Sequence, residues 1–163
     1  MDRNITSYSN STLSTNKRKR HSNVHLSTLP AFNPSNDWRV YCISQRTNTS
    51  LLHYLIDLAR KTTEYTIDTE HDCVTHEAAL IQVEFIRRQS VVLLIEVCHL
   101  PPASTVTFWL IKSLLKIILG PSNIIYSWGN AEHELSLFID YELFSWSILC
   151  QMKNIDIQTA FKT

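Results

Sequence analysis

The chain has 163 residues with 15 basic and 15 acidic side chains, so its formal net charge at pH 7 is zero. Hydrophobic residues make up 44% of the sequence, which predicts a globular domain with a single core. The lack of a basic excess argues against nucleic-acid binding through bulk charge and leaves local patches as its basis. The polar N-terminus is not a signal peptide and no apolar run could span a bilayer, so we expect an intracellular protein without membrane contact.

The cysteines exclude one class of metal and redox site. They are widely scattered and form no C-x-x-C pair, at Cys42, Cys73, Cys98 and Cys150. This spacing fails for zinc ribbons and for dithiol motifs. We therefore expect four small buried apolar side chains in a reducing compartment.

Residues 1–36 are rich in serine, threonine and asparagine and show no apolar periodicity, which predicts a disordered polar tail. The tail contains the basic run Lys17-Arg18-Lys19-Arg20. Such a run can be a nuclear localisation signal, a phosphate-binding patch or a solvated charge cluster. The first of these weakly favours the nucleus over the cytoplasm.

Residues 37–163 are predicted to form one domain that begins with a strand and a helix. Aromatic and β-branched residues alternate in the first strand, and leucines recur at helical spacing after several possible N-caps, including Asn48. The predicted elements of the first half are a strand over 38–44, a helix over 51–61, and strands over 64–70, 78–86 and 91–97. The run 91–95 is apolar on both faces, which predicts a central strand covered by helices on each side.

The second half alternates helices with short strands. Ser104 or Thr105 can cap a helix that ends at Leu119, before the helix-stopping pair Gly120-Pro121. The remaining predictions are a strand over 123–128, a helix over 131–141 capped by Asn130, further helix over 143–152 and a strand over 154–159. This order predicts an α/β fold: a mixed sheet of three antiparallel strands followed by parallel ones, with helices on both faces.

Asp68 and Glu70 are the first candidate functional residues. Alternation along the strand over 64–70 places both on one face, with Thr66. Two carboxylates this close repel each other unless a cation, a proton or water relieves them, and together they can hold one divalent cation. The pattern Asp-x-Glu is common, so its surroundings decide whether it is a metal site.

Three consecutive segments carry a resemblance to a known family. They are Tyr65-Thr66-Ile67-Asp68-Thr69-Glu70, Ala79-Leu80-Ile81-Gln82-Val83 and Val92-Leu93-Leu94-Ile95. Together they resemble the opening of the DEDD-type 3′-5′ exonucleases, in particular the ribonuclease D and Werner-type domains of the ribonuclease H-like superfamily. In that family a strand bearing D-x-E precedes a strand that reads A-x-L-I-Q followed by a hydrophobic residue. The similar region runs from Trp38 to the end of the chain.

The resemblance implies a metal-dependent nuclease. In the family, two Mg²⁺ or Mn²⁺ ions lie between four carboxylates and assist removal of the terminal nucleotide from the 3′ end of RNA or DNA. Carried over, Asp68 would bridge both ions and Glu70 would bind the ion on the nucleophile side. At the position of the family's second aspartate, this chain has Glu134, whose extra methylene changes the reach of the carboxylate.

The third motif of the family is not found. It should lie on a helix after the last predicted strand, beyond Asp156, which is expected to be structural. The sequence therefore leaves three hypotheses: an active metal-dependent exonuclease, a degenerate or truncated relative that binds nucleic acid or a protein partner without cleavage, and a fragment of a longer gene product. A domain without its C-terminal helices should also leave one sheet face uncovered, which predicts poor solubility or self-association through an apolar patch.

Overall fold

The computed structural model describes residues 38–160, and these belong to the second of two compact units, Asn36–Thr163. The tail predicted for residues 1–36, with its basic run Lys17-Arg18-Lys19-Arg20, lies outside the described residues. Its disorder and the domain boundary therefore stay predictions.

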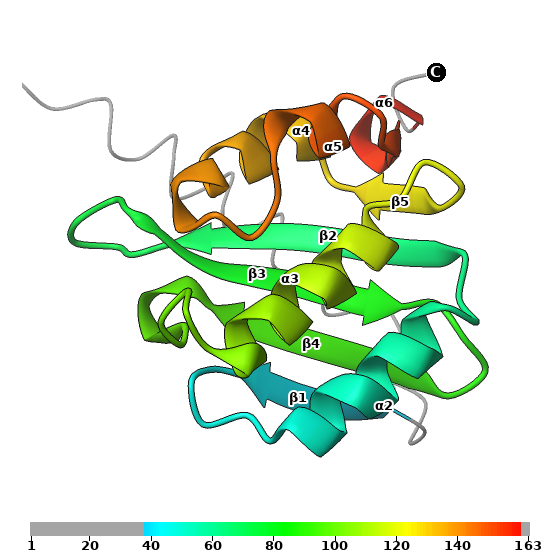
Figure 1. Ribbon diagram of the computed structural model, residues 1–163. Coiled ribbons are helices and arrows are strands. Elements are labelled where there is room, and N and C mark those ends of the chain that lie inside the picture. The colour runs from blue at the N-terminus through cyan, green and yellow to red at the C-terminus, as the bar shows by residue number, and fades with distance from the viewer. Residues whose placement is uncertain (1–37, 161–163) are drawn as a thin grey trace, which may run out of the picture. The chain divides into compact units, whose positions relative to one another are not determined.

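The described residues form a six-stranded sheet in the order β1-β4-β3-β2-β5-β6 (Figure 1). The elements are β1 (Trp38–Ile43), α2 (Thr49–Ala59), β2 (Glu64–His71), β3 (Ala78–Phe85), β4 (Ser90–Glu96), η1 (Val97–His99), α3 (Val106–Ile118), β5 (Ile124–Ser127), α4 (Ala131–Ser136), η2 (Ile139–Tyr141), α5 (Trp146–Leu149), β6 (Lys153–Asp156) and α6 (Ile157–Ala160). Strand β3 is antiparallel to β2 and to β4, whereas the pairs β1–β4, β2–β5 and β5–β6 are parallel. The predicted mixed α/β sheet is confirmed.

The sheet buries one face against helices. Along β2, β3 and β4 the residues that face α2 and α3 are almost fully buried, among them Tyr65, Val83 and Leu93, each 0% exposed. Their alternate neighbours are partly or fully exposed. Alternation therefore defines the core as the sequence predicts.

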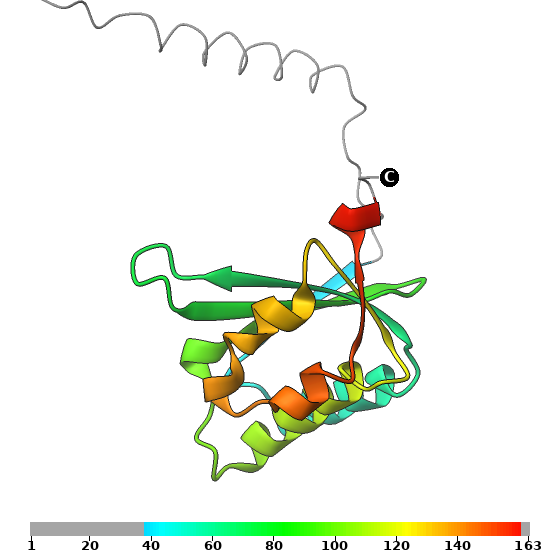
Figure 2. The ribbon, with the colours of Figure 1, turned by 90° about the horizontal axis from the view of Figure 1, so that it is seen from above.

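Helices cover the two faces of the sheet unequally. Helices α2, α3, α4 and α5 lie on the same side of the sheet, and within residues 38–160 no helix lies over the other face of β1 to β4 (Figure 2). Along β2 and β3 this face is largely polar, with Thr66, Gln82 and Glu84 among its residues, whereas β4 presents Val92 and Leu94 on it. An uncovered apolar face and self-association through it stay predictions.

The helix starts follow the predicted capping chemistry. The Asn48 side chain accepts a hydrogen bond from the Ser50 amide at 2.8 Å, and Thr105 Oγ1 accepts one from the Phe108 amide at 3.2 Å. Of the two caps considered for the second helix, the structure selects Thr105.

The predicted helix over 131–141 is wrong in its second half. It ends at Ser136, and Phe138 (φ −103°, ψ 3°) leaves the helical conformation before the short 3₁₀ turn η2. Burial explains the break, because Phe138 is 0% exposed in the core. Glu142 then adopts a left-handed conformation (φ 60°) that prevents the helix from continuing. The predicted helix over 143–152 is reduced to α5, and the last strand ends at Asp156.

The prediction for the cysteines is also wrong. All four are exposed free thiols in the structure: Cys42, Cys73, Cys98 and Cys150. Cys42 lies on the exposed face of β1, Cys98 lies in the short turn η1, and Cys73 is in the β2–β3 connection. Residue type predicted burial on average, whereas the position of each residue determines it.

No helix within residues 38–160 combines the length and the apolar character that a membrane crossing requires.

Tyr65 gives the core a titratable group whose effect on stability can be predicted. Its hydroxyl lies 2.9 Å from the Ala59 carbonyl and 3.0 Å from the Thr62 carbonyl, at the end of α2. Burial raises the pKa of Tyr65 to about 12 from 10.0. The folded chain therefore keeps the proton that the unfolded chain loses, so stability is complete below pH 10 and falls as the pH rises toward 12.

We expect Tyr65→Phe to lower the free energy of unfolding at pH 7 by about 1 kcal/mol and to remove this residue's share of the alkaline loss. Urea unfolding of both proteins at pH 7 and in the alkaline range measures both effects. Parallel alkaline profiles would contradict the assignment.

Candidate functional site

Asp68 and Glu70 lie on the exposed face of β2, as predicted. Asp68 pairs with Gln82 and Glu70 with Leu80 across the antiparallel ladder, and both carboxylates are exposed. The register shifts after Glu70, where a bulge ends the regular pairing. The two carboxylates therefore stand together at the end of the strand, on the face opposite the helices.

The neighbouring strand β5 stops short of this point. It pairs with β2 only from Glu64 to Thr66, which leaves the second half of β2 without a partner strand on that side. The chain turns back at Gly129, whose φ of 114° favours glycine, and Asn130 then caps α4 by accepting a hydrogen bond from the His133 amide at 3.1 Å. This turn starts α4 beside β2 (Figure 1).

Glu134 lies on the first full turn of α4, and its side chain folds back over this turn. A Cβ atom added to Gly129 would lie 3.3 Å from Glu134 Oε1. Burial of Glu134, together with the negative charge of Asp68, raises the pKa of the Glu134 carboxyl. The positive potential of His133 and His71 lowers that pKa, and the charge of Asp156 raises it. The fold thus places Glu134 within electrostatic range of Asp68.

Asp156 holds the turn at Gly129 in place through hydrogen bonds. Its Oδ1 accepts hydrogen bonds from the Gly129 amide at 3.0 Å and the Thr159 amide at 3.3 Å, and its Oδ2 accepts one from the Thr159 hydroxyl at 2.6 Å. The Thr159 hydroxyl is the main cause that lowers the pKa of the Asp156 carboxyl. Asp156 therefore joins the end of β6 to the turn beneath Glu134, which gives the predicted structural role a geometry.

His71 and Phe138 lie at the end of β2, beyond the candidate carboxylates. The predicted strand stops at Glu70, whereas the structure makes His71 the last residue of β2. Its ring centroid lies 6.0 Å from that of Phe138. Tyr141 adds a second tie, because its hydroxyl donates to the Ala78 carbonyl at 2.9 Å. These contacts attach the chain after α4 to the end of β2.

Glu132, two residues before Glu134, lies on a different side of α4. Its carboxylate is 3.9 Å from Cys150 Sγ and so faces the α5 side, not β2. Helical periodicity separates it from Glu134 by two residues, which is more than half a turn.

The donor chemistry suits a hard divalent cation, and the described geometry supplies part of a site. Carboxylate oxygens are the ligands that Mg²⁺ and Mn²⁺ prefer. Within residues 38–160, however, no three side chains of histidine, cysteine, aspartate or glutamate gather closely enough to hold a metal ion. Asp68 and Glu70 on β2 and Glu134 on α4 are the candidate ligands for such an ion.

The raised pKa of Glu134 predicts that its replacement by glutamine stabilises the protein without metal and removes the stabilisation that a cation gives. Because its folded pKa is raised, ionised Glu134 costs stability as the pH rises above its ordinary pKa of 4.5. We expect Glu134→Gln to raise the melting temperature at pH 7 in EDTA, and this gain to vanish at acidic pH. A cation that relieves the repulsion should stabilise the wild type but not the variant. Thermal melts with EDTA and with Mn²⁺ measure both effects, and a variant that Mn²⁺ stabilises as fully as the wild type would contradict the assignment.

Solved structures of exonuclease domains have a similar fold. The EXD2 exonuclease domain soaked in Mn and GMP is similar with a TM-score of 0.54 and 17% identity, covering 76% of this chain and 58% of that chain. The same domain soaked in Mg and dGMP gives 0.53 and 17%, with the same coverage. The Aedes aegypti Nibbler EXO domain gives 0.49 and 12% identity, covering 82% of this chain and 58% of that one.

The chain has the fold of the DEDD 3′-5′ exonuclease domains, which confirms the resemblance at the level of fold. It spans less than two thirds of the length of these structures, 58% of the EXD2 and Nibbler domains and 34% of the Trypanosoma brucei RNase D. No protein-family model and no curated protein sequence matches it.

Proposed function

We propose that this chain is a metal-dependent 3′-5′ exonuclease that acts on nucleic-acid ends. The observation that carries the proposal is that a fold similar to the EXD2 exonuclease domain places Asp68 and Glu70 together on the exposed face of β2, with Glu134 on α4, which contacts that strand. Burial of Glu134, and after it the charge of Asp68, raises the pKa of the Glu134 carboxyl, and a carboxyl with a perturbed pKa is a candidate for a functional site. The exonuclease fold makes phosphodiester hydrolysis the reaction to test first.

Each residue has a separate task in this proposal. Asp68 and Glu70 present oxygen ligands from one rigid strand, and Glu134 presents a third from α4. Bound Mg²⁺ or Mn²⁺ would supply Lewis-acid stabilisation of the phosphate and a more acidic water. Asp156 and Gly129 fix the turn from which Glu134 reaches the strand. The neighbouring EXD2 structures were soaked in Mn with GMP and in Mg with dGMP, which supports these ions and a nucleotide ligand.

The test is release of mononucleotides from a single strand labelled at its 5′ end. The full chain is incubated with RNA or DNA in Mn²⁺, in Mg²⁺ and in EDTA, and the products are resolved by length. We expect a ladder that shortens from the 3′ end with either ion, no products in EDTA, and no reaction on a strand whose 3′ end is blocked. Intact substrate in Mn²⁺ would overturn the proposed activity.

A second candidate, binding without cleavage, is favoured by a specific observation. Three metal-ligating side chains do not gather among residues 38–160, and Glu134 stands where the family has the shorter aspartate. A misplacement of ~1 Å at a reacting centre can cost ~100-fold in rate. A chain that binds the single strand but leaves it intact in Mn²⁺ would support this candidate over the first.

A further inference from the structure

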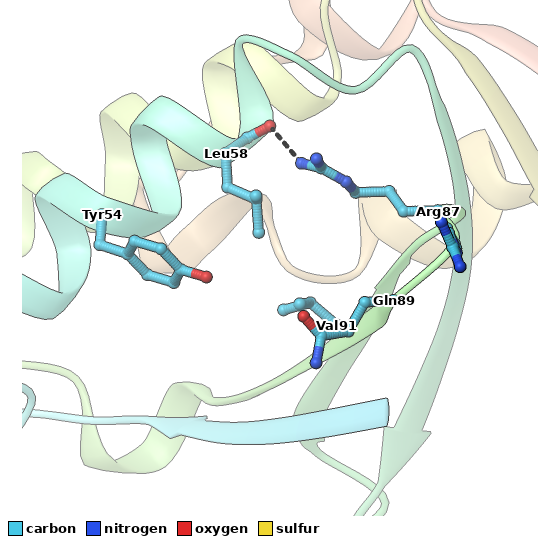
Figure 3. A pocket seen from close by; sticks show the side chains of 6 residues that line it. Tyr54, Leu58, Arg87, Gln89 and Val91 are labelled. Atoms are coloured by element: carbon cyan, nitrogen blue, oxygen red, sulfur yellow. Dashed lines mark hydrogen bonds between the residues drawn. The ribbon is translucent and has the colours of Figure 1, made fainter. Parts of the chain in front are cut away.

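A cavity far from the carboxylates lies between α2 and the connection from β3 to β4 (Figure 3). Its volume is about 490 Å³, within the usual range of small-molecule sites. Its lining comprises Tyr54, Leu58, Arg87, Arg88, Gln89 and Val91. Leu58 and Val91 form its apolar part, and Tyr54 stands beside it with 45% of its surface exposed.

The charge of this cavity is positive and unbalanced. Among residues 38–160, two guanidinium groups line it and no carboxylate does. Asp57, a carboxylate on the same helix, is engaged by Arg60 at 3.0 Å. Arg39 pairs with Val91 in the register of β1 and β4, and so adds a third guanidinium on that face of the sheet.

The two lining arginines differ in what they already bind. Arg87 Nη1 donates to the Thr62 hydroxyl at 3.2 Å and, less closely, to the Leu58 carbonyl at 3.4 Å, which fixes its guanidinium at the C-terminus of α2 (Figure 3). Arg88 is exposed and makes no hydrogen bond or ion pair with the rest of residues 38–160. Capping of the helix therefore explains Arg87 but leaves Arg88 available to an anion.

We propose that this cavity binds one nucleotide unit, with its phosphate on Arg88 and Arg87 and its base against Tyr54. Guanidinium groups match phosphate oxygens in charge and geometry. An exposed aromatic ring beside a cationic groove is the arrangement on which unpaired bases stack. The Gln89 amide can donate and accept hydrogen bonds at a base edge. The ligand is a free nucleotide or a nucleotide within a single strand, because both present this chemistry.

The site is separate from the carboxylates and does not depend on the proposed hydrolysis. Arg87 and Arg88 follow Phe85, which pairs with Tyr65 near the start of β2, whereas Asp68 pairs with Gln82 further along the strand. The pocket therefore lies toward the opposite end of β2. Binding here needs no divalent cation, so it is measured in EDTA, where failure of the carboxylate site has no effect.

The test uses the full chain and fluorescence anisotropy of a labelled oligouridine of about ten nucleotides, within the range of known single-strand sites. Arg88→Ala and Tyr54→Leu are compared with Arg46→Ala, which removes an equally exposed arginine from a different hollow that also contains Glu96. Circular dichroism verifies that each variant is folded. Uridine monophosphate is titrated in parallel by calorimetry to distinguish a free nucleotide from a strand.

We expect about tenfold weaker oligouridine binding for Tyr54→Leu, and for Arg88→Ala a loss of affinity with a salt dependence reduced by about one phosphate contact. Arg46→Ala should bind as the wild type does. If Arg88→Ala and Tyr54→Leu weaken oligouridine binding and the wild type does not bind uridine monophosphate, the site takes a strand. If the two variants weaken only the binding of uridine monophosphate, the site takes a free nucleotide. Equal behaviour of all three variants, or no binding of either ligand by the wild type, would overturn the proposal.

Discussion

Asp68→Asn is expected to lower Mn²⁺-dependent nucleotide release by at least about a thousandfold, because stabilisation by a bound metal ion is worth several kcal/mol in the transition state. The charge of Asp68 adds to burial in raising the pKa of Glu134, so the substitution removes both a proposed metal ligand and one of the charges that act on Glu134. The measurement is the rate of mononucleotide release under single-turnover conditions.

The matched control is Asp57→Asn, which removes an exposed carboxylate of α2 that pairs with Arg60 on the protein surface. Exposed ion pairs contribute about 0–1 kcal/mol, so this variant should keep both its fold and its activity. If both variants lost activity equally, or if Asp68→Asn kept it, Asp68 would not be a metal ligand.

Phe138→Ala is expected to lower the free energy of unfolding by about 3–5 kcal/mol. The ring is 0% exposed and lies 6.0 Å from the His71 ring and 6.4 Å from the Tyr141 ring, centroid to centroid. Its loss leaves a cavity between the chain after α4 and the end of β2. Urea unfolding followed by circular dichroism measures the change.

Leu137→Ala provides the comparison in the same turn. Leu137 is 51% exposed, so its truncation should change stability by no more than about 0.5 kcal/mol. Equal effects of the two substitutions would show that Phe138 does not anchor this turn.

The sheet and its first carboxylates were predictable from the sequence because they depend on local pattern. Alternation along 64–70 and 78–86 predicts which residues of β2 and β3 face the core, and Tyr65 and Val83 are buried as expected. The same alternation places Asp68 and Glu70 together on the exposed face. Capping by Asn48 and Asn130 is equally local, since each side chain bonds an amide two or three residues away.

The parts that sequence could not supply depend on contacts between distant segments. Nothing near Phe138 in the sequence indicates that it leaves its helix to pack beside His71. Asp156 meets Gly129 only because β6 lies beside β5 in the sheet. The side of the sheet on which each helix packs also follows from the whole topology, so the run 91–95 suggested cover on both faces where residues 38–160 supply one (Figure 2).

Glu134 lies between these cases. Its position after a strand and a capped turn predicted its place on α4, whereas its approach to Asp68 is a result of the early end of β5. Its carboxylate, one methylene further from the backbone than that of an aspartate, lies over Gly129, a residue without a side chain. Local sequence pattern therefore identifies Glu134 as a candidate, whereas tertiary structure brings it within electrostatic range of Asp68.

The most direct test of this account is a titration with Mn²⁺, in which electron paramagnetic resonance detects the free ion. The wild-type chain is compared with Asp68→Asn and Glu134→Gln at pH 7, with circular dichroism to verify that each protein is folded. We predict that the wild type binds Mn²⁺ and that each variant loses most of that binding, because in the proposed site Asp68 and Glu134 are ligands of the same ion. Undiminished binding in both variants, or no binding by the wild type, would contradict the assignment of a metal site to these two carboxylates.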